Sequence, residues 1–358
     1  MKKFKSLLAM VLVIMMIFSL TACSSTKETD NKNASVTEVP KDNNEATPTS
    51  ATPAAGGYTF GIAMPQLDND GFKANLVGIK QKAEELGITI ITSDAKGNAD
   101  TQMQQIEDFI TRGVDAIVMC PIDSGALAAA VQKANTAGIP ISSFDRNVSG
   151  GILAGLAESD NIAHGAKAAE LMAEAAEKNG VAISDLKVLE LLGTISTNTG
   201  LQRHEGFSKR AEELGIEIVA SLPTEYKMDI AYSAVLDAFQ ANDKINAIFV
   251  ASDNALYSGV ESALLQLKKL NAIGEEGHII VTTVDGGPQG LAGIRAGFID
   301  GIAAQSKLIM SYEAVMLAYK TLTGEKIDQT VVRILPIPVT IDNVDDETLW
   351  ANAINKKE

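Results

Sequence analysis

The stretch AEELGITIIT (Ala83–Thr92) returns later in the chain as AEELGIEIVA (Ala211–Ala220). Each copy reads as a helix end followed by a strand, and two more strand segments follow each copy in the same order: AIVMCP (116–121) and GIPISSFDR (138–146), then AIFVAS (247–252) and HIIVTTVDG (278–286). Apolar strands without alternation, separated by helical segments, predict parallel sheets covered on both faces. Asp145 and Asp285 stand just past the last strand of each set. We therefore predict two copies of one α/β unit whose carboxylates face a shared ligand cleft.

Length and composition indicate how large the fold can be and which partners are unfavourable. At 358 residues, 46% of them hydrophobic, the chain is long enough for two domains with sizeable cores. Only 5% of residues are aromatic, so aliphatic side chains must fill those cores. The formal net charge of −15 repels phosphate backbones, so we expect no nucleic-acid partner.

The N-terminus reads as a targeting segment. A basic start (MKKFK) precedes an apolar run, Leu7–Leu20, that is too short to span a bilayer comfortably. The run ends in Leu-Thr-Ala-Cys, which resembles a bacterial lipoprotein signal. This resemblance implies a signal peptide at 1–22, cleavage before Cys23, and acyl chains such as palmitate on that cysteine. The alternative is an ordinary secretory signal with an incidental cysteine.

The segment 23–57 is small, polar and proline-containing, so we predict a lipidated cysteine followed by a disordered tether. Cys120 is the only other cysteine, and a lipidated Cys23 would therefore exclude an intramolecular disulfide.

Helices and strands alternate from Tyr58 onward. We predict that Gly87 closes the first helix and that Asp160 caps a later one. A closing segment with Pro336 and Pro338 covers Val331–Ile341, and the tail Asp342–Glu358, with Trp350, is expected to pack on the outside of a lobe. Outside the repeated strands, the clearest predictions are strands at 58–64 and 299–304 and helices at 72–86, 102–112, 125–137, 287–296 and 310–322.

The chain from Tyr58 to Ile341 resembles the ribose- and galactose-type periplasmic sugar-binding proteins of ABC transporters. The motifs that carry the resemblance occur in order: GIAMPQLDNDGF, AIVMCPID, IPISSFDR, SDNIAHGAKAAELM, GLQRHEGF, AIFVASDNAL and VTTVDGGPQG. The resemblance implies an α/β fold of two doubly wound parallel-sheet lobes joined by a three-segment hinge, the type I periplasmic-binding-protein fold. The N-terminal lobe would comprise 58–159 plus 306–334, and the C-terminal lobe 160–305 plus 335–358. Transcription regulators that share this fold begin with a DNA-binding helix-turn-helix, and here a signal peptide and tether stand in its place.

The resemblance also implies a ligand site around the two aspartates. Asp145 and Arg146 would bind sugar hydroxyls, because a carboxylate accepts from two adjacent hydroxyls and a guanidinium donates to two oxygens. The alternative for this pair is a structural ion pair. Asp285 and Arg203 would bind from the second lobe, with helix capping and a solvated charge as their respective alternatives.

Five further positions complete the predicted ligand site. Gln305 would donate its amide to the sugar, unless it is only a polar hinge residue. Phe72 and Tyr226 would lay aromatic faces on the ring, or else pack in the core and under a loop. Asp70 would accept from a hydroxyl or cap its helix. Ser252 stands where relatives often have asparagine.

Departures from the family pattern put the particular sugar in doubt. Lys73, Cys120, Ser252 and Val284 replace residues usual in relatives. Smaller side chains at the last three positions suggest room for a hexose or a short oligosaccharide.

Other chemistries lack their motifs. The sequence contains no G-x-S-x-G and no P-loop, its three histidines are scattered, and no Cys/His/Asp cluster has metal spacing. We therefore predict no enzyme activity, cofactor or metal.

The sequence thus predicts a monomeric, extracytoplasmic lipoprotein, anchored to the cell membrane, that binds a mono- or short oligosaccharide by hinge closure and delivers it to an ABC permease. The alternative is a sensor that presents a sugar or autoinducer to a membrane receptor. Replacing Asp145 or Asp285 by alanine is expected to abolish binding while leaving the fold intact.

Overall fold

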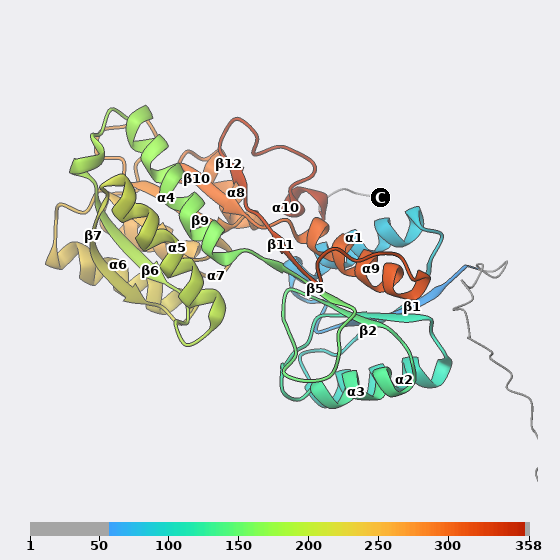
Figure 1. The fold of residues 1–358 in the computed structure, drawn as a ribbon. Helices are drawn as coiled ribbons and strands as arrows, with labels where there is room; N and C mark the ends of the chain where they lie inside the picture. The colour runs from blue at the N-terminus through green and yellow to red at the C-terminus, as the bar shows by residue number, and fades with distance from the viewer. Residues whose placement is uncertain (1–56, 355–358) are drawn as a thin grey trace, which may run out of the picture. The chain divides into compact units, whose positions relative to one another are not determined.

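The computed structural model describes residues 57–354. The predicted signal peptide, the predicted lipidation at Cys23 and almost all of the predicted tether lie outside the described residues. Within 57–354, no helix is both long and apolar enough to cross a membrane. The described chain forms two six-stranded sheets with helices packed against them (Figure 1).

The first sheet has the strand order β11-β5-β4-β3-β1-β2, and every pairing in it is parallel. Four helices accompany it: α1 (Asp70–Glu85), α2 (Ala99–Arg112), α3 (Ala128–Thr136) and α9 (Lys307–Thr323). Its strands are β1 (Thr59–Met64), β2 (Thr89–Asp94), β3 (Ala116–Met119), β4 (Ile141–Phe144), β5 (Gly155–Ser159) and β11 (Val331–Ile334).

The second sheet has the order β12-β10-β9-β8-β6-β7. Its strands are β6 (Lys187–Leu192), β7 (Glu217–Pro223), β8 (Ala247–Val250), β9 (Ile280–Asp285), β10 (Gly301–Ala304) and β12 (Ile337–Val339). The elements around it are α4 (Asn161–Lys178), the 3₁₀ helix η1 (Ile183–Asp185), α5 (Asn198–Leu214), α6 (Met228–Ala241), α7 (Asp253–Gln266), α8 (Pro288–Arg295) and α10 (Trp350–Ala353).

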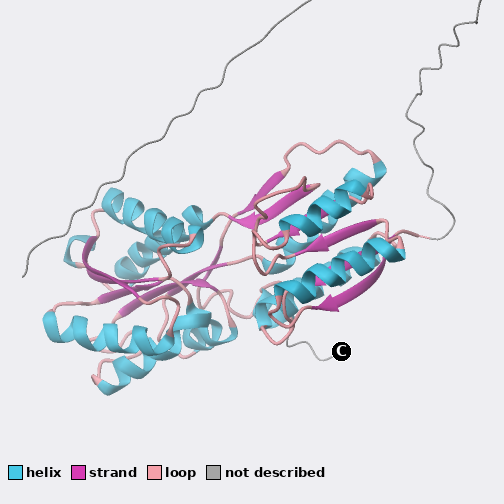
Figure 2. Cartoon of the chain, turned by 90° about the horizontal axis from the view of Figure 1, so that it is seen from below, coloured by secondary structure: helices cyan, strands magenta, loops and turns pink. Residues whose placement is uncertain are grey.

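The two sheets repeat one strand order, so the predicted duplication and the predicted fold class are confirmed. In each sheet the second strand in sequence lies at the edge beside the first, and the third to fifth follow on the other side. Figure 2 shows helices on both sides of the strands, as a doubly wound unit requires. One pairing departs from the parallel pattern, because β12 runs antiparallel to β10.

The local predictions hold best where turn chemistry is strong. Gly87 has φ +66° after α1, and the Asp160 side chain accepts from the Ala163 N–H at the start of α4. The sequence did not predict β5, because this strand (GLAES) is short and includes weak strand formers. The predicted segment 331–341 is not one strand: it divides at Leu335-Pro336, so that β11 and β12 belong to different sheets.

The chain passes between the sheets three times. The passages run from β5 to α4, from β10 to α9, and from β11 to β12. Helix α4 packs on α5, β9 and β10, whereas α9 packs on α1, β3, β4 and β5. The three-segment connection predicted for the fold is therefore present.

The C-terminal tail contributes one large side chain to a core. Trp350 is only 2% exposed and belongs to a hydrophobic core cluster together with residues of the second sheet. Its indole N–H donates to the backbone carbonyl of Asp285 at 2.8 Å. A buried tryptophan needs both apolar contact and an acceptor for its N–H. The core cluster supplies the first and the Asp285 carbonyl the second.

Candidate functional site

A cavity of about 860 Å³ lies at the carboxyl ends of strands from both sheets, beside the passages from β5 to α4 and from β10 to α9. Its lining is predominantly polar or charged, which suits a ligand with many hydroxyl groups. Seven of the nine predicted binding residues line it: Asp145, Arg146, Arg203, Tyr226, Ser252, Asp285 and Gln305.

A smaller cavity of about 190 Å³ shares part of this lining. It adds the predicted Phe72 and the unpredicted Trp350. The residues common to both cavities are Asp145, Arg146, Asp285, Gln305 and Lys307. The two cavities therefore meet at the paired aspartates, and eight of the nine predicted residues lie around them.

Asp285 is held firmly in place. Its carboxylate accepts from Arg203 Nη2 at 2.8 Å, from Gln305 Nε2 at 2.6 Å and from the Ser252 hydroxyl. Its φ of +101° is unusual for a residue with a side chain, and such strain persists only where the surroundings fix it. The helix-capping alternative for Asp285 is absent, because α8 has no side-chain cap bond.

Arg203 is buried and fully engaged, which is incompatible with the alternative of a solvated charge. Its side chain is 4% exposed. In addition to the bond to Asp285, Nη1 donates to the Ala251 carbonyl at 2.6 Å and Nε to Asn161 Oδ1 at 3.1 Å. Arg203 thus links three places by hydrogen bonds: the residue after β8, the start of α4 and Asp285.

The electrostatics of this corner favour an ionised Asp285. Burial by itself raises the pKa of this carboxyl, but the charges of Arg203 and Lys307 and the hydrogen bonds outweigh burial, so the pKa is lowered. The neighbouring Asp253 is fully buried, and burial followed by repulsion from Asp285 raises its pKa to about 8.

Asp253 has a structural role that the sequence reading did not identify. Its carboxylate accepts from the backbone N–H groups of Gly286 and Gly287, both at 2.8 Å, and from the Thr283 hydroxyl at 3.0 Å. These bonds fix the turn that follows Asp285. The spacing of Asp253 from Asp285 gave no signal for this contact, because the two lie on different strand ends.

Asp145 has much looser surroundings. Among residues 57–354 its carboxylate receives no hydrogen bond, and the nearest cations, Arg146 Nε and Lys307 Nζ, are each 3.9 Å away. Its φ is +64°, a conformation that aspartate tolerates better than most residues. Arg146 is half-exposed, donates weakly to the Pro121 and Ile122 carbonyls, and lies 5.7 Å from the Phe72 ring centroid. The carboxylate and guanidinium are therefore available to other partners.

Gln305 and Tyr226 each carry a buried polar atom with no hydrogen-bond partner in the described part of the chain. Gln305 uses its amide nitrogen on Asp285, so its free group is the acceptor Oε1 rather than the donor that the sequence reading expected. The Tyr226 ring packs over Gly193, where a Cβ atom would lie 2.1 Å from Cζ, so only glycine fits beneath it. Burial raises the pKa of Tyr226.

Asp70 is the predicted residue that lies outside both linings. It is the first residue of α1, and its exposed carboxylate pairs with Lys73 at 2.8 Å. The capping alternative is also wrong, because the side chain of the preceding Asn69 accepts from the Phe72 N–H. Phe72 was expected either to pack in the core or to face the ligand, and its position suits both. It is 9% exposed within a core cluster, and it also lines the smaller cavity.

The family departures contribute to the site unequally. Ser252 lines the large cavity and bonds Asp285. Cys120 and Val284 are fully buried in core clusters and line neither cavity, so their size does not enlarge the site. Burial also raises the pKa of the Cys120 thiol.

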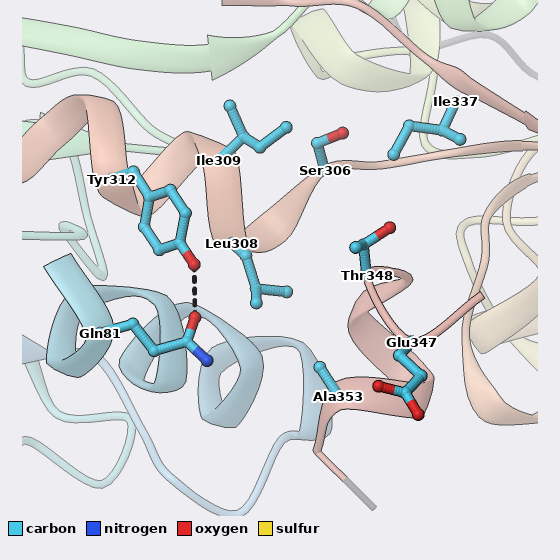
Figure 3. Close-up of a pocket in the computed structure, with 9 residues that line it drawn as sticks. All are labelled: Gln81, Ser306, Leu308, Ile309, Tyr312, Ile337, Glu347, Thr348 and Ala353. Carbon is cyan, nitrogen blue, oxygen red and sulfur yellow. Dashed lines mark hydrogen bonds between the residues drawn. The ribbon is translucent and has the colours of Figure 1, made fainter. Parts of the chain in front are cut away.

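A third cavity, of about 480 Å³, lies beside the first turns of α9 (Figure 3). Its lining is mainly apolar, with Leu308, Ile309 and Ile337, and a hydrogen bond joins the Tyr312 hydroxyl to Gln81. It contains none of the predicted binding residues. A hydroxyl-rich ligand would leave its polar groups unpaired there, so the polar cavity is the candidate site.

Each of the three histidines has its own hydrogen-bond partner. His204 bonds the buried Glu190, His164 in the first turn of α4 bonds the Asp160 carbonyl, and His278 pairs with Asp300. Among the described residues there is no group of three or more His, Cys, Asp or Glu side chains placed to hold a metal ion.

Comparison with known proteins agrees with this fold. A family model described as a periplasmic binding protein domain matches residues 60–326. The chain therefore belongs to the periplasmic binding protein family, and the family resemblance seen in the sequence is confirmed.

Three similar proteins illustrate the relationship. The ribose import binding protein of Bacillus subtilis is 28% identical over 274 residues, which cover 76% of this chain and 85% of that protein. The D-apiose import binding protein of Actinobacillus succinogenes is 29% identical over 266 residues, covering 72% and 80% respectively. A crystal structure of an ABC transporter periplasmic solute-binding protein from Actinobacillus succinogenes with bound D-allose has a TM-score of 0.68 and 26% identity, covering 81% of this chain and 99% of that one.

Proposed function

We propose that this protein is the substrate-binding component of an ABC sugar importer, capturing a mono- or short oligosaccharide and delivering it to a membrane permease. The observation that carries the proposal is the polar cavity at the strand ends of both sheets, with two charged aspartate sites at its centre. The names of the relatives support it, since they describe import binding proteins for ribose and D-apiose. No enzymatic step is part of the proposal.

The lobes assigned to this function are 58–159 plus 306–334 and 160–305 plus 335–358. Sheet membership supports these bounds, because β1 to β5 and β11 share one sheet and β6 to β10 and β12 share the other. We infer that the ligand is enclosed by rotation of the lobes about the three passages, and that the enclosed form docks on the permease.

The proposed binding residues are Asp145, Arg146, Arg203, Tyr226, Ser252, Asp285, Gln305 and Phe72. Asp145 and Arg146 would bind sugar hydroxyls directly, since both have spare hydrogen-bonding capacity. Arg203 and Ser252 would act mainly by orienting Asp285. A sugar hydroxyl would donate to Gln305 Oε1, a buried acceptor without a described partner.

Anchoring forms a separate part of the proposal. We infer that Cys23 is acylated and holds the protein on the outer face of the cell membrane through the segment 23–57. Metabolic labelling with a palmitate analogue tests this inference: label should appear on the wild type and be lost in Cys23→Ser. Equal labelling of both proteins would refute it.

Titration calorimetry with a panel of pentoses, hexoses and short oligosaccharides tests the binding function. We expect saturable binding of at least one sugar, and the thermal midpoint of unfolding should rise with that sugar by mass action. Asp70→Asn is the matched control, because Asp70 lies outside both cavities. Failure of every sugar to bind would refute the proposal.

A further inference from the structure

Lys307 lies at the meeting point of the two cavities, and the sequence reading did not single it out. Its side chain is 13% exposed, and Nζ lies 3.9 Å from Asp145 Oδ1, beyond hydrogen-bond distance. No residue between 57 and 354 accepts a hydrogen bond from this ammonium. A lysine ammonium carries three donors, so its bonding capacity faces the cavities unused.

The position of Lys307 is also unfavourable for its own helix. It is the first residue of the 17-residue α9, whose N-terminal end carries partial positive charge, and the Ser306 side chain makes no capping bond there. A cation at this position is repelled by the helix dipole and is partly removed from water. The charge of Lys307 favours the ionised Asp285, but the helix end does not favour a cation at this position. An anion at the cavity would be attracted by both the ammonium and the helix end.

The charges lining the larger cavity reverse the balance of the whole protein. The chain has 45 acidic and 30 basic residues. The lining instead has four basic side chains, Arg146, Arg203, Lys307 and Arg333, against three acidic ones, Asp145, Glu158 and Asp285.

Two pairs in this lining are already matched. Arg203 pairs with Asp285 at 2.8 Å, and Arg333 with Glu158 at 3.4 Å. Asp145 remains with two cations, Arg146 and Lys307, each 3.9 Å away. One positive charge therefore lacks a partner in the lining.

We propose that the ligand is a sugar acid, a polyhydroxylated molecule with one carboxylate, and that Lys307 binds that carboxylate. This inference rests on the proposed sugar-binding function and narrows its substrate class. A single surplus charge matches a carboxylate better than a phosphate ester, which carries nearly two negative charges. The free Gln305 Oε1 beside it accepts from a hydroxyl of the same molecule.

Calorimetry with paired ligands tests this proposal. The pairs are glucuronate with glucose, galacturonate with galactose, and gluconate with glucitol, since each differs mainly by a carboxylate. In at least one pair the acid should bind roughly 10- to 100-fold more tightly, the range for a hydrogen bond to a charged group. The preference should weaken as salt rises, and Lys307→Met should abolish it.

The variant should fold normally. Removing this cation relieves its repulsion by the helix N-terminus but also removes its attraction to Asp285, so the thermal midpoint of the ligand-free protein should change little. Measuring that midpoint separates a lost preference from a loss of folding. Lys73→Met is the matched control, because Lys73 lies outside both cavities.

Each contrary result is distinct. If a neutral sugar binds more tightly than its acid and Lys307→Met changes neither, the sugar-acid inference is overturned while the sugar-binding function stands. If glucose 6-phosphate binds more tightly than glucuronate, the carboxylate assignment is overturned. If no member of any pair and no other sugar binds, the proposed function itself fails.

Discussion

Asp145 directly follows β4 and Asp285 is the last residue of the equivalent strand β9. Both have positive φ, but their carboxylates have opposite surroundings. Asp285 accepts hydrogen bonds from Arg203, Gln305 and Ser252, and its backbone carbonyl accepts from Trp350. Asp145 has only two cations at 3.9 Å. Duplication therefore supplied one scaffold twice, with one preorganised and one adaptable half-site.

This difference has an energetic meaning. A carboxylate fixed by several donors keeps its position without ligand, so binding does not have to order it. A carboxylate with few partners can reorient toward ligand hydroxyls, but some of the binding energy is then spent on ordering it. We infer that the second sheet sets the ligand's position and that the first sheet adapts to it.

The largest expected effect comes from Asp285→Asn. Removing this charge leaves the buried Arg203 uncompensated, which should lower the free energy of unfolding by about 3 kcal/mol. Ligand affinity should also fall at least about tenfold. Urea denaturation and calorimetry measure the two effects. The fold should stay intact, as expected from the sequence, but it should be less stable.

The matched variant Asp145→Asn should separate binding from stability. Asparagine also tolerates positive φ, and no described donor loses a hydrogen bond, so unfolding should change by less than about 0.5 kcal/mol. Affinity should nevertheless fall at least about tenfold. Equal loss of stability in the Asp145 and Asp285 variants would refute the asymmetry between the two half-sites.

Trp350→Phe tests whether the hydrogen bond to the Asp285 backbone carbonyl helps to hold Asp285 in place. Phenylalanine retains most of the apolar contact but loses the N–H that donates to the Asp285 carbonyl. The expected loss is about 1–2 kcal/mol in the free energy of unfolding, with weaker ligand binding. If affinity is unchanged while stability falls, Trp350 supports the core alone and does not help to hold Asp285.

A pH series tests the buried pair of His278 and Asp300, in which His278 lies shortly before β9 begins. His278 bonds Asp300 at 3.1 Å, and both side chains are at most 5% exposed. Burial lowers the pKa of His278, but the Asp300 hydrogen bond and charge outweigh this effect and raise it. Because the folded pKa is raised, the stabilisation is complete below the unfolded value of about 6.5 and is lost as pH rises through the folded pKa.

Chemical denaturation of the wild type and His278→Gln across about pH 6 to 8.5 measures this dependence. The wild type should lose stability relative to the variant as pH rises. A constant difference between the two proteins would contradict the raised pKa.

The smallest effect is expected at Asp70, although the sequence placed it in the site. Its ion pair with Lys73 is exposed, and such pairs contribute at most about 1 kcal/mol. Asp70→Asn should therefore change ligand affinity less than about twofold, within the scatter of surface substitutions. A tenfold loss of affinity would mean that Asp70 reaches the ligand after all.

The sequence was most informative where local chemistry repeats. The AEELGI repeat, the apolar strands and the helix-ending glycines predicted the sheets and their duplication, because these signals depend on neighbouring residues. Motif order also brought eight of the nine predicted residues to two adjoining cavities. Asp70 lies outside both cavities, where its exposed carboxylate pairs with Lys73.

Only the tertiary structure decided how these residues are partnered. Arg203 and Asp285 are 82 positions apart, and Trp350 is a further 65 positions beyond Asp285, so no local pattern reveals their contacts. The surplus charge of Lys307 likewise appears only when three passages of the chain bring four basic and three acidic side chains to one cavity. The sequence by itself determined two matching α/β units, because strand and helix patterns are local. The tertiary structure decided that their half-sites differ, because hydrogen bonds and charge balance depend on residues that meet only after folding.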